Sequence, residues 1–498
     1  ISVSGSVPGG VYTDLLNAGV LDQGDFYYRY NDLDYRWVSY QDWNYTTTLN
    51  LPESLFENEK VVLEFDGLDT AAEILLQDTT ELGRAQNMFS KYLFDITNYS
   101  ETPTDTKFPP ECLDPAYQGE CHVNMIRKMQ ASFSWDWGPA FPNVGIWKAW
   151  RIVGWSSAKL SSISVFPKPD ISLPNKKDPN LLAPWTVNFR AYFDLASNIS
   201  ISGTLQISVG DTEYFNSEVF VNENNFVEDS FKIPEVIIIN ILNDGVSSLT
   251  KRIGFRTIEL DQSFVDDSDQ SIGRHFRAAV NNVTMFLLGS NWIPAHVLPE
   301  QVTPPYTRLL LEAARDTHQN CLRVWGGGIY ESDEFYEIAD EFGLLIWEDM
   351  MFACSMYPAD DNYLDSVRSE TRTQIRRLQH HPCILLWATN NENESALRSN
   401  WYGTSSNFSL YKNDYIKLYV DTVTNTIKEE DPSRPVIISS PSNGIESEEE
   451  GYVAENPSDN HYGDAHYYDY TSNGWSWDHY PTTRFASEYG FQSFPSYQ

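Results

Sequence analysis

The chain has 498 residues, 41% of them hydrophobic and 21% charged, with 27 Gly and 26 Pro. This length predicts about two to four domains, and the composition excludes a disordered, collagen-like or coiled-coil protein. Seventy acidic residues against 34 Lys and Arg give a net charge of −36. Nucleic-acid binding, which needs a basic face, is therefore not predicted. No apolar run approaches the roughly 20 residues of a membrane-spanning helix, so we expect no membrane span.

The first half of the chain predicts two β-sandwiches. Residues 1–158 read as short strands, for example 60–65 (KVVLEF) and 71–77 (AAEILLQ), separated by turn residues. A link rich in Pro, Asp and Lys follows, at residues 167–184. Strand patterns at 186–195, 203–210 and 251–260 then favour an immunoglobulin-like sandwich over residues 159–262.

From residue 275 to 498 strands alternate with amphipathic helices. A helix over 306–320 is expected to turn Leu310, Ala313, Ala314 and Thr317 inward. The next helix is predicted to run from Ser332, as N-cap, to Gly343. Seven strands in this alternation predict a (β/α)8 barrel, a TIM barrel, that is truncated after its seventh strand. The fold class is thus a multidomain β plus α/β protein.

The cysteines and glycosylation sequons favour the secretory route. Cys112 and Cys121 lie in one Pro-rich stretch and suit a small disulfide loop, whereas Cys321, Cys354 and Cys383 lie in apolar runs and are expected to be buried thiols. Because the chain begins at Ile1, its cellular address is not readable from its start. Asn-x-Ser/Thr sequons occur at Asn44, Asn98, Asn198, Asn282, Asn393 and Asn407.

Two predicted strand ends carry carboxylates. The fourth strand ends in residues 387–392 (WATNNE) and the seventh in residues 484–490 (RFASEYG). In a (β/α)8 barrel these ends meet at the catalytic mouth, where one protonated and one ionised carboxylate are sufficient for glycosidic cleavage. The alternative is a pair of solvated surface acids. The sequence contains no phosphate loop, dinucleotide fingerprint, CxxC pair or HExxH motif, so neither a cofactor nor a metal is expected.

An ordered set of motifs resembles the family 2 glycoside hydrolases, and among them the lysosomal β-mannosidases of animals. The motifs are FDGLDT at 65–70, FSWDWGP at 133–139, GSNWIP at 289–294, RVWGGG at 323–328, NNE at 390–392 and SEYG at 487–490. The resemblance implies a jelly-roll sugar-binding-like sandwich, an immunoglobulin-like sandwich and a catalytic barrel. It also implies a retaining exo-β-mannosidase that acts on glycans and oligosaccharides, in the lysosome or secreted.

The same resemblance assigns roles to individual residues. Glu392 would be the general acid/base and Glu488 the nucleophile. Substrate would be bound by Asn391, Asp136, Trp135, Trp325, His466 and Tyr468. Other interpretations stay open: Trp325 as a core or rim aromatic, the 135–136 turn as a cap on its sandwich, and His466 as a buried, satisfied histidine.

Some features depart from the family pattern or leave the function open. Leu288 and His296 replace the Lys and Asp of many relatives, and both are expected near the first strand end, where they would alter the charge of the pocket. Asn393 follows the acid/base directly, so it is predicted to carry no glycan. The alternative functions are a β-galactosidase or β-glucuronidase of the same family, and a non-catalytic carbohydrate-binding fragment.

Overall fold

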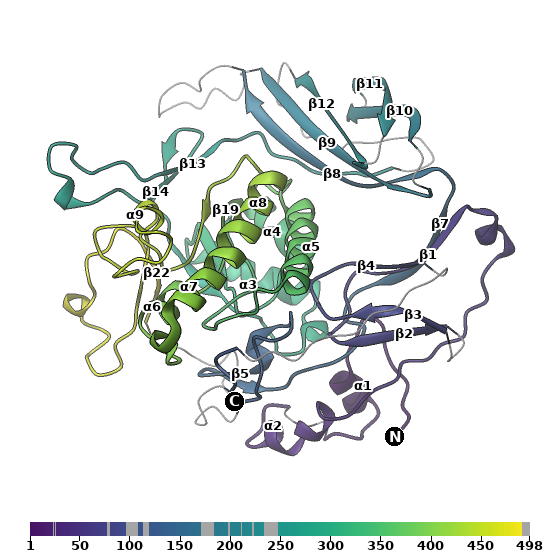
Figure 1. Ribbon diagram of the computed structural model, residues 1–498, viewed down its shortest axis with the longest axis horizontal. Helices are drawn as coiled ribbons and strands as arrows, with labels where there is room; N and C mark the ends of the chain where they lie inside the picture. Colours follow the sequence, from purple (N-terminus) through teal and green to yellow (C-terminus); the bar gives the residue numbers. More distant parts are fainter. Residues whose placement is uncertain are drawn as a thin grey trace.

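The computed structural model describes residues 1–22, 24, 26–76, 80–95, 108–112, 119–170, 184–197, 200–210, 212–221, 224–233 and 248–490. Within them, no helix is both long enough and apolar enough to cross a membrane. The described strands form several short sheets and one larger parallel sheet, and the helices of the C-terminal half lie beside this larger sheet (Figure 1). The described part is therefore a multidomain, β-rich fold.

The N-terminal region combines helices with small antiparallel sheets. Its elements are α1 (Val11–Asn17), α2 (Asn31–Asp34), β1 (Lys60–Phe65), β2 (Ala72–Leu76), β3 (Thr80–Ala85), β4 (Tyr92–Asp95), β5 (Phe133–Trp135), β6 (Gly138–Ala140) and β7 (Trp150–Trp155). The order β4-β1-β7 makes one sheet, and β2-β3 and β5-β6 are separate pairs. The predicted strand at 60–65 is confirmed, and the one at 71–77 is confirmed over Ala72–Leu76, with residue 77 outside the described residues. The reading of the first 58 residues as strands is wrong, because Val11, Tyr12 and Leu15 bury one face of helix α1.

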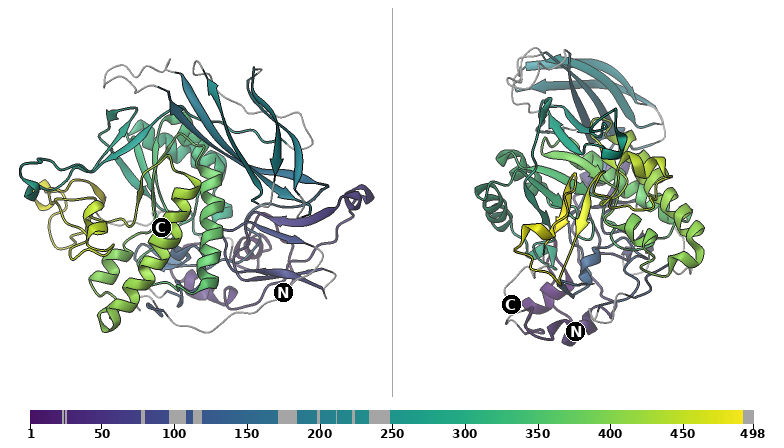
Figure 2. Two further views of the ribbon diagram at one scale, coloured as in Figure 1. Left: turned by 45° about the horizontal axis from the view of Figure 1, so that its top comes forward. Right: turned by 90° about the vertical axis from the view of Figure 1, so that its left-hand side faces the viewer.

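A second region, formed by strands β8 to β12, has a hydrophobic core of its own. It contains β8 (Ala158–Pro169), β9 (Trp185–Leu195), β10 (Ile201–Val209), β11 (Thr212–Val221) and β12 (Phe226–Ile233). Sheet β12-β9-β8 and pair β10-β11 enclose a core that includes Trp185, Phe189 and Phe231. This layer lies at the top of Figure 1 and on the outside of both views in Figure 2. It rests on the helices through Tyr192, whose hydroxyl donates to Glu430 at 2.7 Å.

The third region holds the parallel strands. Its strands are β13 (Ile258–Asp261), β14 (Arg277–Val280), β15 (Val283–Thr284), β16 (Gly289–Trp292), β17 (Cys321–Val324), β18 (Leu345–Asp349), β19 (Ile384–Ala388), β20 (Val436–Ile437), β21 (Ala465–Tyr467) and β22 (Ala486–Tyr489). Strands β16 to β20 form one parallel sheet in chain order, and β21 pairs in parallel with β22. The strand predicted over 251–260 is wrong for most of its length, since only its last residues join β13.

Helices connect these strands. They are α3 (Pro304–Asp316), α4 (Asp333–Phe342), α5 (Asp361–Leu378), α6 (Asn393–Arg398), α7 (Phe408–Tyr415), the π-helical η8 (Ile416–Thr424), α8 (Asn425–Glu430) and α9 (Ile445–Glu449). Helix α4 begins after Ser332 and ends at Gly343, whose φ of 70° is the left-handed cap that glycine favours. Its predicted bounds are therefore confirmed.

The inward face predicted for the helix over 306–320 is confirmed only at Ala314. In α3 the buried residues are Thr307, Leu311 and Ala314, whereas Ala313 and Thr317 are exposed. Three consecutive leucines, 309–311, fit more than one helical phase, and contact with neighbouring elements selects Leu311.

A buried ion pair fastens the N-terminal region to the parallel sheet. Arg127 donates to both carboxylate oxygens of Glu370 in α5, at 2.8 and 2.6 Å. Asn87 and Tyr330 donate to the same carboxylate at 2.9 and 2.8 Å. Both partners of the pair are almost fully buried. The pair thus sets how the N-terminal region lies against the sheet.

Glu370→Ala is expected to lower the free energy of unfolding by about 3–5 kcal/mol, because it leaves the Arg127 guanidinium buried without a counter-ion. Chemical denaturation of the purified protein measures this loss. Glu341→Ala is the control. Glu341 pairs with Arg308 on the surface, where ion pairs contribute little to stability, so the midpoint of the denaturation curve should barely move. Equal midpoints for the two variants would contradict the fastening role.

Candidate active site

A cavity of about 1040 Å³ opens at the carboxyl ends of the parallel strands. Its lining includes every predicted site residue: Trp135, Asp136, Trp325, Asn391, Glu392, His466, Tyr468 and Glu488. The strand ends of β17, β19, β21 and β22 bring six of them together, and the β5–β6 hairpin supplies the other two. Residues more than 350 positions apart thus share one pocket.

The two predicted carboxylates face each other. Oxygen atoms of Glu392 and Glu488 and a ring nitrogen of His466 all lie within 4.8 Å of one another. Glu392 has a left-handed backbone, with φ 63°, which is uncommon outside glycine and marks a constrained position. Its N–H donates to the Ser440 carbonyl at 2.8 Å, and its own carbonyl accepts from Ala396 in α6. This strand-to-helix corner points the Glu392 side chain into the cavity.

Glu488 is held as an anion. Arg323 forms an ion pair with one of its oxygens, and the Tyr468 hydroxyl donates to the other at 2.9 Å. His466 Nδ1 lies 3.4 Å from the latter oxygen. Burial raises the pKa of Glu488, but the charges of His466 and Arg323 outweigh this effect and the pKa is lowered. An ionised carboxylate is what a nucleophile requires.

Glu392 has two different neighbours. Its Oε1 lies 2.7 Å from His466 Nδ1, and its Oε2 accepts from the thiol of Cys354 at 3.1 Å. Cys354 was expected to be a buried core thiol, but it is partly exposed and lines the cavity. Burial and the adjacent Glu392 raise the pKa of this thiol well above its usual value, so it remains a donor. The sequence feature that could have assigned Cys354 to the cavity is its position just after the third parallel strand, β18.

The sequence analysis also did not assign Arg323, a positively charged residue of the site. Arg323, inside β17, donates to Asp349 at 2.7 Å, to Asn291 at 2.9 Å and to Asn391 at 2.8 Å, besides its pair with Glu488. Burial raises the pKa of Asp349 to about 6, against the opposing effect of Arg323. A charged residue within an otherwise apolar strand was the available signal.

Three tryptophans form one wall of the cavity. Trp135 and Trp137 meet Trp325 edge-on, with ring centroids 4.8 and 5.5 Å apart. Asp136, at the hairpin tip, is exposed and lines the same cavity. The 135–136 turn therefore reaches the pocket and does more than cap its sandwich. Trp325 is only 5% exposed and belongs to the large hydrophobic core, so it chiefly supports Trp135, in line with the core-aromatic alternative.

The other predictions from the sequence are partly confirmed. The Cys112–Cys121 disulfide is confirmed, and Cys321 and Cys383 are buried thiols. Leu288 lines the cavity as expected, but His296 packs against Tyr27, with ring centroids 5.3 Å apart, so its predicted place at the pocket is wrong. The sequon side chains are exposed at Asn44 and Asn407, partly buried at Asn282 and fully buried at Asn393, whereas Asn98 and Asn198 lie outside the described residues.

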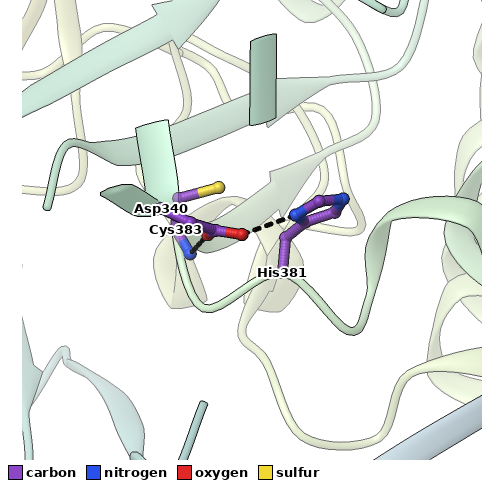
Figure 3. A group of neighbouring side chains, drawn as sticks. All are labelled: Asp340, His381 and Cys383. Atoms are coloured by element: carbon purple, nitrogen blue, oxygen red, sulfur yellow. Dashed lines mark hydrogen bonds and ion pairs between the residues drawn. The ribbon is translucent and has the colours of Figure 1, made fainter. Parts of the chain in front are cut away.

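A second cluster of potential metal-ligand atoms lies away from the cavity, at Asp340, His381 and Cys383 (Figure 3). Asp340 accepts from the Cys383 N–H at 2.8 Å and lies 2.6 Å from His381 Nδ1. These contacts use both carboxylate oxygens in a hydrogen-bonded turn. At Glu392 and Glu488 the oxygens are likewise engaged, by Arg323, Tyr468, His466 and Cys354. Neither arrangement requires an ion to satisfy its donors and acceptors.

Comparison with known proteins gives one consistent picture. Residues 1–148 match the family model described as glycosyl hydrolase 2 galactose-binding domain-like. The chain is 39% identical to the β-mannosidase of Rattus norvegicus, over all of this chain and 60% of that protein. It is 33% identical to the probable β-mannosidase of Caenorhabditis elegans, over 99% of this chain and 58% of that protein.

The solved structures agree. A β-D-mannosidase from Dictyoglomus thermophilum matches with a TM-score of 0.75 at 27% identity, over 95% of this chain and 58% of that one. The chain thus spans about 60% of the length of the curated relatives it matches. The resemblance to family 2 glycoside hydrolases that the motifs predict is confirmed, because the chain is similar to β-mannosidases over its whole length.

Proposed function

We propose that the protein is a retaining exo-β-mannosidase, which releases terminal non-reducing β-D-mannose from glycans and oligosaccharides. One observation carries this proposal: carboxylate oxygens of Glu392 and Glu488 lie within 4.8 Å of each other in one cavity. Retaining glycosidases hold their carboxyl groups about 5–5.5 Å apart, whereas inverting enzymes need about 6.5–9.5 Å to admit a water molecule.

The reaction then proceeds by double displacement. Glu488, kept ionised by Arg323 and His466, attacks the anomeric carbon while Glu392 protonates the leaving oxygen, and a mannosyl ester forms. Glu392, now a carboxylate, takes a proton from water, and the resulting hydroxide displaces Glu488. Each step uses the same pair of carboxyl groups in opposite roles.

The other lining residues would recognise the sugar. Asn391, fixed by Arg323, is suited to the 2-hydroxyl group, where a hydrogen bond strengthens as positive charge develops. Trp135 offers an aromatic face and Asp136 a carboxylate for hydroxyls at the non-reducing end. Tyr468 and His466 position Glu488 and Glu392. The hairpin at one side of the pocket favours exo attack.

The finer architecture and setting belong to the same proposal. We assign residues 1–158 to a jelly-roll sandwich, 159–262 to an immunoglobulin-like sandwich and 275–498 to the first seven strands of a (β/α)8 barrel. The expected setting is the lysosome or the secreted fraction, with N-glycans at some of Asn44, Asn98, Asn198, Asn282 and Asn407. No cofactor is invoked, since both chemical roles fall to carboxyl groups.

The whole protein is expected to hydrolyse p-nitrophenyl β-D-mannoside with a kcat/KM at least about 100-fold above those of the matching galactoside, glucoside and glucuronide, a difference of about 2.7 kcal/mol. NMR of the first turnovers should show β-mannose before mutarotation. A preferred galactoside or glucuronide would replace the mannosidase assignment by one of the family alternatives. No turnover of any of these glycosides would favour the carbohydrate-binding alternative.

A further inference from the structure

A chain of buried hydrogen bonds runs from Asp464 to the two catalytic carboxylates. Asp464 accepts the Ser442 N–H on Oδ1 at 3.0 Å, and the Ser440 and Ser487 hydroxyls on Oδ2 at 2.7 and 2.5 Å. Ser440 Oγ lies 3.2 Å from His466 Nε2. Asp464 and Ser440 are completely buried. On its other side His466 meets Glu392 and Glu488, as described above.

We propose that Asp464 and Ser440 are positioning residues that fix the proton of His466 on Nε2, so that Nδ1 is a proton site serving Glu392. A serine hydroxyl has one hydrogen. Ser440 donates it to Asp464 at 2.7 Å, rather than to Ser487 at 3.5 Å. Its oxygen is then an acceptor towards His466, and Nε2 must carry the hydrogen.

This tautomer leaves Nδ1 to exchange one proton with Glu392. As an imidazolium, His466 donates from Nδ1 to Glu392 and also faces Glu488, while Arg323 and Tyr468 engage Glu488 from other strands. As a neutral ring, its Nδ1 accepts from a protonated Glu392. The carboxylates of Glu488 and Glu392 raise the pKa of His466 despite the opposing effect of burial, in accord with a proton stored there.

The role rests on the proposed glycosidase reaction, and its protons balance. In the first step the single proton held between Nδ1 and Glu392 passes through Glu392 to the leaving oxygen, the glycosidic bond breaks and Glu488 forms the ester. Glu392 is then a carboxylate and His466 a neutral ring. In the second step water gives a proton through Glu392 back to Nδ1, its hydroxide bonds to the sugar, and the ester breaks. His466 and both carboxylates end as they began.

Asp464→Asn tests the tautomer with an isosteric change. The Ser442 N–H needs an acceptor, so the asparagine oxygen takes the Oδ1 place and its NH₂ replaces Oδ2. Ser440 would then accept from asparagine and donate to His466 Nε2, which moves the ring proton to Nδ1. In ¹⁵N NMR of histidine-labelled protein, above the pH at which His466 titrates, we expect Nε2–H in the unmodified protein and Nδ1–H in this variant. The His466 signals are assigned by their loss in His466→Gln.

Kinetics give a second readout. With Nδ1–H fixed towards Glu392, kcat should fall about tenfold or more for an alkyl β-mannoside, which needs acid assistance, and less than about threefold for the 2,4-dinitrophenyl glycoside, which needs little. Glu341→Gln is the control: it makes the same carboxylate-to-amide change in a surface ion pair with Arg308, and both spectrum and kinetics should match the unmodified protein.

An unchanged His466 tautomer in Asp464→Asn would overturn the proposal. Ser440→Ala provides a second test if that variant does not fold: without the serine oxygen, a mixture of tautomers is expected, and a pure Nε2–H form would equally overturn it. The NMR result requires no substrate, so failure of the mannosidase assignment is told apart from failure of the tautomer assignment.

Discussion

Glu488→Ala is expected to lower kcat/KM of the whole protein for p-nitrophenyl β-D-mannoside by about 10⁴-fold or more, equivalent to about 5 kcal/mol of transition-state stabilisation. The variant has no atom that can form the glycosyl ester. Glu392→Ala should lose about 10²–10⁴-fold, with the larger losses on poor leaving groups that need a proton. Steady-state kinetics on a series of aryl mannosides measure both effects. Glu341→Ala, which removes a surface carboxylate, should match the unmodified protein.

Azide distinguishes the two roles by stereochemistry. In Glu488→Ala a small anion fits the vacated space and attacks from the side of the nucleophile, so the product should be α-mannosyl azide. In Glu392→Ala the ester still forms, and azide then attacks from the opposite side to give β-mannosyl azide. NMR of the isolated azides identifies the anomer. The same anomer from both variants, or full activity in either, would refute the assignment of nucleophile and acid/base.

The sequence could locate these two carboxylates because the alternation of strand and helix patterns predicts where the parallel strands end. The βα alternation placed 387–392 and 484–490 at the ends of parallel strands, and such ends meet at one edge of a sheet. The motifs then supplied Trp135 and Asp136, which no local pattern assigns to the pocket. Their hairpin reaches it only because the N-terminal region packs against the parallel sheet through contacts such as Arg127 with Glu370.

What the sequence could not supply is the pairing of buried charges. Arg323 meets Asp349 and Glu488, which lie 26 and 165 positions away, and no periodicity encodes such contacts. Cys354 was assigned to the core because its neighbours are apolar, yet residues that follow a parallel strand also line the mouth of the pocket. The His466 contacts likewise depend on Ser440 and Asp464, small residues with no distinctive spacing.

Arg323 is expected to matter more for the site than any residue other than the two catalytic carboxylates. Arg323→Ala leaves Asp349 and Glu488 buried without their shared guanidinium, and the free energy of unfolding at neutral pH should fall by about 3–5 kcal/mol. Arg323→Lys keeps a charge but not the planar fork that contacts Asp349, Glu488 and Asn391, so a smaller loss is expected. Denaturation curves of the three proteins give these differences.

The pH dependence of stability tests whether Arg323 keeps Glu488 ionised. Because Arg323 lowers the pKa of Glu488, its stabilisation is fully present above the unfolded-state pKa of about 4.3 and is lost as the pH falls through the lower folded-state value. The stability gap between Arg323→Ala and the unmodified protein should therefore shrink in acid. Its residual kcat/KM should also show an acid limb at higher pH, since the effect of burial on the pKa of Glu488 is then opposed only by His466 and the Tyr468 hydroxyl. An unmoved acid limb would mean that Arg323 does not control the ionisation of Glu488.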